Sequence, residues 1–238
     1  MPDLSWTLPV ARWSYWPANA GRPADVEFVE PMVRRRLSSL SRMALKVAGD
    51  CVDARPATRV VFASRHGELR RTTDILRAID AGEPVSPNAF SLSVLNAMSG
   101  LFGIARRDRS AASALSAGAQ TLGYALLEAF AQHQEAPHTP VLVVYADEPA
   151  DPVYGAVEDE VSGCALAVLL DGETAPLGRL TCAVSERAVD QEAADRFATQ
   201  SDALHHCLQR GGRATWRAAG AQGQPQWQWQ WEHHDRAA

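Results

Sequence analysis

The sequence lacks both a membrane-spanning stretch and a cysteine framework. No apolar run approaches the roughly 18 to 20 residues that a transmembrane helix needs, and residues 1–6 show no basic region leading into the apolar core of a secretory leader. The cysteines are too widely spaced for a zinc site or a disulfide scaffold: they are Cys51, Cys164, Cys182 and Cys207. We therefore expect a cytoplasmic protein whose cysteines are reduced and buried as small apolar side chains.

An excess of positive charge is also absent. The formal net charge is −5, which gives no general affinity for nucleic acid. The histidine pairs His205–His206 and His233–His234 are adjacent in sequence, so the two rings of a pair cannot face one metal ion from a helix. We expect no metal and no cofactor. What the chain does have is 46% hydrophobic residues, enough to fill the core of one domain over residues 1–238.

The order of periodic segments predicts an α/β protein. Apolar residues at spacings of three and four, ended by glycine or begun by a capping residue, indicate helices, and short β-branched runs indicate buried strands. The predicted helices are Glu30–Gly49, Glu68–Ala81, Asn96–Ala105, Ser116–Gln132 and Asp190–Gln209. The predicted strands are Arg59–Ser64, Phe90–Val94, Ser110–Ala114, Val141–Tyr145, Val161–Leu170, Leu177–Ser185 and Trp227–Trp231.

One run has the shape of a nucleophile turn but carries leucine at its centre. It reads Ser-Ala-Leu-Ser-Ala-Gly over residues 113–118, between a predicted strand and a predicted helix rich in small residues, Gly118 to Phe130. Together with residues 86–97, this region resembles the amino-terminal half of the β-ketoacyl synthases of the thiolase superfamily. In that family the turn holds a cysteine that takes the acyl chain as a thioester. The equivalent residue here is Leu115, which has no lone pair to activate.

The resemblance implies a thiolase-like α/β fold that is one half of a ketosynthase, with a β-rich carboxy-terminal extension. The half would span about residues 28–187, and a helix and a tryptophan-rich strand would occupy 188–238. Among its relatives, the chain is similar to the truncated chain-length-factor type found beside aryl polyene and type II polyketide pathways. The two histidine motifs that a full synthase supplies do not occur; His66-Gly67 comes nearest and is interpreted as a polar turn.

The family also implies a role. A silent half would pair with a full-length β-ketoacyl synthase as a heterodimer, help to form the acyl tunnel and limit chain length. The residues expected at the tunnel or the interface are Ser113, Leu115, Ser116, Phe90 and Asn96. The basic run Arg106, Arg107 and Arg109 would attract the acidic acyl carrier protein, although a charged surface loop explains it equally well.

Other interpretations remain open at this stage. Ser116 lies in an approximate Gly-x-Ser-x-Gly elbow and could serve an acyltransferase or hydrolase, or it could simply cap the following helix. A scaffold that only binds acyl carrier protein is a third alternative.

The strict alternation of Trp227, Trp229 and Trp231 places three indoles on one face of a strand. That face must either pack in the core, covering the small-residue helix, or form an interface.

Overall fold

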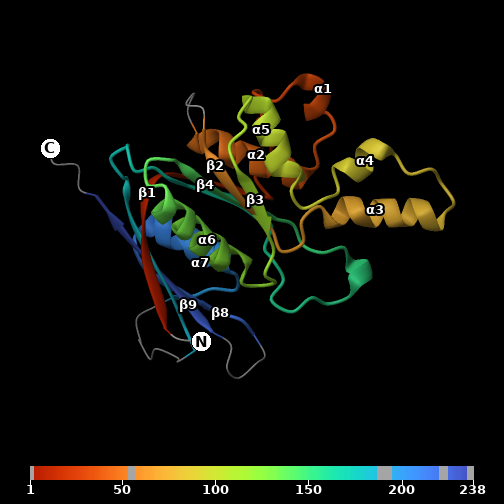
Figure 1. The fold of residues 1–238 in the computed structure, drawn as a ribbon. Coiled ribbons are helices and arrows are strands. Elements are labelled where there is room, and N and C mark those ends of the chain that lie inside the picture. Colours follow the sequence, from red (N-terminus) through yellow and green to blue (C-terminus); the bar gives the residue numbers. More distant parts are fainter. Residues whose placement is uncertain (1–2, 53–56, 187–194, 220–224, 235–238) are drawn as a thin grey trace.

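One twisted sheet runs through the whole structure. The computed structural model describes residues 3–52, 57–186, 195–219 and 225–234, and within these ranges nine strands form a single sheet with helices on both faces (Figure 1). In spatial order the strands are β3 (Ala112–Leu115), β2 (Arg59–Ala63), β4 (Val141–Asp147), β5 (Cys164–Leu170), β1 (Leu4–Pro17), β6 (Gly178–Ser185), β9 (Gln226–His233), β8 (Gly212–Arg217) and β7 (Asp195–Arg196).

Helices cover both faces and give the protein two cores. They are α1 (Pro31–Arg34), α2 (Ser39–Cys51), α3 (Leu69–Asp80), α4 (Pro87–Ser91), α5 (Ala97–Arg106), α6 (Thr121–Glu135) and α7 (Gln200–Arg210), with a 3₁₀ turn at Pro152–Tyr154. Successive side chains of a strand point to opposite faces. Thus Val60 and Phe62 join the core under α2 and α5, whereas Val61 and Ala63 join the core under α6 and α7.

The three strands at one end of the sheet bring three turns together. Strands β3, β2 and β4 are parallel, and from β4 onward to β9 each neighbouring pair is antiparallel. The carboxyl ends of parallel strands meet at one edge of a sheet. The turns that follow Ala63, Leu115 and Asp147 therefore lie together.

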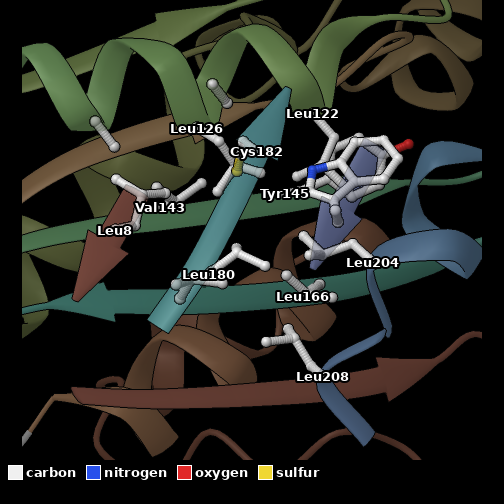
Figure 2. Close-up of a cluster of buried hydrophobic side chains, with 14 of the residues drawn as sticks. Leu8, Leu122, Leu126, Val143, Tyr145, Leu166, Leu180, Cys182, Leu204 and Leu208 are labelled. Carbon is white, nitrogen blue, oxygen red and sulfur yellow. The ribbon is translucent and has the colours of Figure 1, made fainter. Parts of the chain in front are cut away.

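The core beneath α6 is filled by strands that are distant in sequence. In Figure 2, Leu122 and Leu126 of α6 point toward the strand side chains Val143, Tyr145 and Leu180. Two leucines of α7, at positions 204 and 208, close the same cluster from the other helix. This cluster joins the parallel strands to the antiparallel ones in one core.

The tryptophans of β9 belong to this core. Trp227, Trp229 and Trp231 are all buried, and the rings of Trp227 and Trp229 stack at 6.3 Å between centroids. A Cβ added at Gly123 of α6 would lie 2.4 Å from the Trp227 ring. The chain thus covers its own small-residue helix, which decides the question left open by the sequence in favour of core packing.

Several predicted elements are confirmed in place, and others are wrong. The strands β2, β4, β5 and β6 and the helices α3 and α5 lie close to their predicted positions. The predicted helix 30–49 is instead two helices, α1 and α2, with Gly49 inside the second. Phe90 lies in α4, not in a strand, because Ser86 accepts a hydrogen bond from the Ala89 amide and starts a helix at Pro87.

The two ends of the sequence contain the remaining differences. Strand β1 was not predicted, since Pro9 and Pro17 argue against a central strand; Pro9 is accommodated in the half of β1 that pairs with β6 alone. Strand β8 was also missed. The predicted helix 190–209 begins only at Gln200, and residues 195–196 form β7; its first residues, 190–194, lie outside the described residues.

All four cysteines are buried and unpaired, as predicted. Burial raises the pKa of the Cys51, Cys164 and Cys207 thiols to about 12 and raises that of Cys182 as well. These side chains behave as small apolar groups and not as nucleophiles.

The close contact between Gly123 and Trp227 yields a stability prediction. The substitution Gly123→Ala should lower the free energy of unfolding by about 1 to 3 kcal/mol, because the new methyl group meets an indole held on all sides. The matched control is Gly100→Ala in α5, where an added Cβ has no atom within 4 Å. That change should be neutral or should stabilise by up to about 1 kcal/mol. Urea unfolding of both variants measures the difference; equal effects would contradict the described packing.

Candidate functional site

Leu115 lies at the carboxyl end of β3, an outer strand of the sheet. It pairs with Ala63 of β2 and is partly buried against the core beneath α6. Its side chain lines an open hollow of about 350 Å³. The other residues that line this hollow come from the following turn and from α6: Ser116, Ala117, Tyr124, Leu127, Glu128 and Ala131. The walls are mainly apolar, with polar groups only at Ser116, Glu128 and the Tyr124 hydroxyl.

The turn after Leu115 differs from the predicted strand-to-helix elbow. Helix α6 begins at Thr121 and not at Ser116. Residues in between form a loop in which Gly118 has a φ of +58°. Thr121 Oγ1 accepts a hydrogen bond from the Ala117 amide at 2.9 Å and donates to the Gly118 carbonyl at 2.7 Å, which fixes the loop. Leu115 is therefore six residues before the first residue of the helix, and the loop of residues 116–120 lies between them.

The amino end of α6 is occupied by a side chain from another helix. The backbone amide of Gly123 donates to Gln200 Oε1 at 2.8 Å, and Gln200 at the start of α7 is only 3% exposed. Beside it, Trp227 Nε1 donates to Gln120 Oε1 at 2.9 Å. A helix amino terminus stabilises a thiolate or an oxyanion through such amides. Here one of them is already bound to a neutral amide group.

Sequence reasoning missed Gln200, and no local signal could have found it. It follows Thr199, whose hydroxyl accepts from the Asp202 amide and caps α7. Its contact with Gly123 joins positions 77 residues apart. Only the three-dimensional arrangement of α6 and α7 brings the two groups together.

Ser116 does not cap α6, as one interpretation of the sequence had it. Its hydroxyl donates to the carbonyl oxygen of Arg65 at 3.0 Å, and the helix begins at Thr121. A carbonyl oxygen is not a base that can take the proton of a nucleophilic serine. Within the part of the chain that the structure describes, no histidine is hydrogen-bonded to Ser116.

A buried carboxylate links the ends of strands β2 and β4 through hydrogen bonds. Asp147, at the end of β4, is fully buried and accepts from Ser64 Oγ at 2.7 Å and from the amides of Arg65 and His66 at 2.7 and 3.0 Å. Burial raises the pKa of Asp147, and these hydrogen bonds oppose the rise. The group joins the end of β2 to the end of β4 and holds the Arg65 carbonyl where Ser116 meets it.

His66 is confirmed as a polar turn residue, but its ring has a side-chain partner. Its Nε2 lies 2.8 Å from Glu160 Oε1. Glu160 also accepts from the amides of Ala150 and Val161. The His66 ring thereby ties the turn after β2 to the segment that leads into β5.

The other predicted site residues do not line the hollow at Leu115. Ser113 lies on β3, where its hydroxyl accepts from Gln132 Nε2 at 3.4 Å. Phe90 is 62% exposed on α4, and Asn96 is the capping residue of α5; neither lines the hollow. Figure 1 shows α3 and α4, the helix that contains Phe90, extending sideways from the sheet.

The basic run lies at the opposite end of β3 from Leu115. Arg106 ends α5 with its guanidinium 5.4 Å from the centre of the Phe102 ring. Arg107 takes a left-handed conformation as the α5 cap, and both it and Arg109 are exposed. Two of the three arginines are therefore available to an acidic surface.

A search for metal sites and membrane spans among the described residues gives two findings. No three His, Cys, Asp or Glu side chains in this part of the chain gather in a way that could hold a metal ion. No helix there is both long and apolar enough to span a bilayer.

Comparison with known proteins identifies the family. The chain belongs to the β-ketoacyl synthase family: the description "Beta-ketoacyl synthase, N-terminal domain" matches residues 6–231. It is similar to a chain of the complex of the ketosynthase ApeO with its chain length factor ApeC from Xenorhabdus doucetiae, at 25% identity and a TM-score of 0.71. That alignment covers 94% of this chain and 99% of the other. The two chains are thus of similar length.

A second solved structure, the ishigamide ketosynthase/chain length factor, shares the fold. It has 19% identity and a TM-score of 0.56, over 86% of this chain and 73% of that chain. None of the curated proteins matches. The resemblance inferred from residues 113–118 and the thiolase-like α/β fold are therefore confirmed.

The geometry predicts that a cysteine placed at position 115 stays unactivated. The thiol of Leu115→Cys should alkylate with half-maximal rate at about pH 8.5 or above, whereas a helix-activated thiol would react below about pH 7.5. Iodoacetamide labelling of the native protein followed by intact mass gives the profile. Wild-type protein is the control, since its own thiols are buried. A profile shifted well below neutral pH would show that the α6 amino end activates a thiol at this position and would contradict the prediction.

Proposed function

We propose that this chain is the non-catalytic partner of a full-length β-ketoacyl synthase, of the chain-length-factor type. The observation that carries the proposal is the site itself: leucine replaces the nucleophile, and Gln200 occupies a first-turn amide of the helix that would activate one. The similarity in length and fold to a chain of a ketosynthase–chain length factor complex supports it. We treat residues 1–238 as one ketosynthase-like domain, with the half at about 28–187 and the extension at 188–238.

The partner would pair along β3. The Val60 amide donates to the Ala111 carbonyl and the Ser64 amide to the Leu115 carbonyl. Because the backbone groups of alternate residues point to opposite sides of a strand, those of Ala112 and Ala114 face away from β2. Among the described strands β3 ends the sheet, and an unpaired strand edge of this kind is a template for another chain.

Exposed apolar side chains extend this candidate interface. Ile104 of α5, which packs beside β3, is 75% exposed, and Leu76 and Ile79 of α3 are 52% and 56% exposed. With Phe90 they give the protein large apolar side chains on the α3–α5 side of the sheet. Apolar surface of this kind is typical of permanent complexes. The small-residue helix α6 is not part of this argument, because β9 already covers it.

The hollow at Leu115 would contribute to the wall of the acyl tunnel. It is open, mainly apolar and next to the strand edge where the partner would lie. An alkyl or polyene chain held by the partner could extend against it, with Ser113 and Ser116 at its rim and with Phe90 and Asn96 on the partner-facing side. The size of residue 115 would then set how far such a chain can grow, as expected for polyketide or aryl polyene synthesis.

Arg107 and Arg109, which are both exposed, would form a docking site for the acyl carrier protein. Acyl carrier proteins are strongly acidic as a class, and complementary charge increases the rate of encounter. This loop and Leu115 lie at opposite ends of β3. A carrier protein would therefore dock at one end of the strand while the acyl chain lies at the other.

Pairing is tested by removing one outward hydrogen-bond donor. Ala112→Pro deletes an amide that faces away from β2, so it should weaken association with a co-expressed full-length ketosynthase at least tenfold while the subunit stays folded. Ala112→Val keeps the amide and is the matched control. Size-exclusion chromatography with light scattering measures the complex. Wild-type subunit that elutes as a stable monomer beside the synthase, or as a homodimer only, would refute the proposed pairing.

The tunnel role is tested through the products. In the reconstituted pair, Leu115→Trp should shorten the main product because the indole fills the hollow, and Leu115→Ala should lengthen it. Leu115→Met nearly conserves volume and should leave the product unchanged. Mass spectrometry of carrier-bound products gives the chain lengths. Identical products from all three variants would exclude a tunnel role for this position, and a stoichiometric acyl adduct on Ser116 would favour the hydrolase instead.

A further inference from the structure

A small, partly enclosed cavity lies at the amino end of α6, apart from the Leu115 hollow. Its volume is about 10 Å³. Residues from α6, from the loop before it, from β4, β8 and the start of α7 line it: Arg65, Gly118, Ala119, Leu122, Tyr145, Asp159, Val161, Thr199, Gln200 and Trp216. Several of these carry polar atoms, so the cavity is not an apolar void.

One buried hydrogen-bond donor at this cavity needs an acceptor. The Gly123 amide donates to Gln200 Oε1, which fixes the orientation of the Gln200 side chain and leaves Nε2 on the other side. Across residues 3–52, 57–186, 195–219 and 225–234, no protein atom accepts from this buried Nε2. A buried donor without an acceptor costs about 1 to 3 kcal/mol.

The cavity has the right size for one water molecule. A water needs about 10 to 15 Å³ of accessible volume and two to four polar partners. A phosphate, a carboxylate or any organic group is too large. A water oxygen can accept from two donors, and its two protons can be donated to oxygen atoms on Tyr145, Asp159 or Thr199, which line the same cavity.

We propose that the amino end of α6 binds a single structural water, held by Gln200 Nε2. The water and Gln200 together form a neutral hydrogen-bonded plug where a helix terminus otherwise attracts an anion. This inference concerns residues of this chain alone and does not depend on the proposed partner or tunnel.

The direct test is a crystal structure of the wild-type protein at high resolution. We expect one spherical density peak in the cavity, at about 3 Å from Gln200 Nε2. A cavity without density, or a Gln200 amide rotated so that Nε2 bonds to a protein oxygen, would overturn the proposal.

A solution measurement uses two matched variants. Oxygen-17 magnetic relaxation dispersion counts long-lived internal waters, and Gln200→Met should lose one of them relative to the wild type. Gln120→Met is the control: Gln120 bonds to Trp227 at the same helix end but does not line the cavity, so the count should be unchanged. An unchanged count in Gln200→Met, or the same loss in both variants, would refute the role of Gln200.

Discussion

The packing of Trp227 against Gly123 is the contact on which the rest of the architecture depends. Helix α6 can approach the sheet closely only because Gly123 has no side chain, and β9, between β6 and β8, buries its indoles against this helix. The same contact sets the position of the α6 amino end. That position in turn brings Gly123 within hydrogen-bonding distance of Gln200 and leaves Leu115 on the preceding strand.

Several independent features of the turn after β3 differ from what an activated thiolate needs. Changing residue 115 alone removes a nucleophile, but the loop of residues 116–120 also separates that position from the helix, and a buried glutamine satisfies one of the amides. Each of these features works against an activated thiolate by a different physical route: absence of a lone pair, a loop between the residue and the helix, and prior occupation of a donor. Together they favour the proposed non-catalytic role.

The sequence pattern correctly predicted those elements that bury one regular face of a helix or strand. The β-branched runs of β2, β4 and β5 and the amphipathic α3 were recognisable because burial on a regular face imposes a period. Strand β1 was not, since Pro9 argues against a central strand and is accommodated where β1 pairs, among the described strands, with β6 alone. At the site, Leu115 could be found from its place in the run 113–118. The contacts of Ser116 with Arg65 and of Gly123 with Gln200 could not, because they join residues 51 and 77 positions apart in sequence.

The position of β9 in the sheet also determines when the fold can form. Residues 226–233 pair on one side with β6 and on the other with β8, and they supply the indoles beneath α6. A chain emerging from the ribosome therefore carries an incomplete core and an unpaired β6 edge until this late segment is made. Contacts between segments so distant in sequence slow folding and expose apolar surface meanwhile. During synthesis of this protein there is thus an interval in which the incomplete core is exposed and chaperones can bind it.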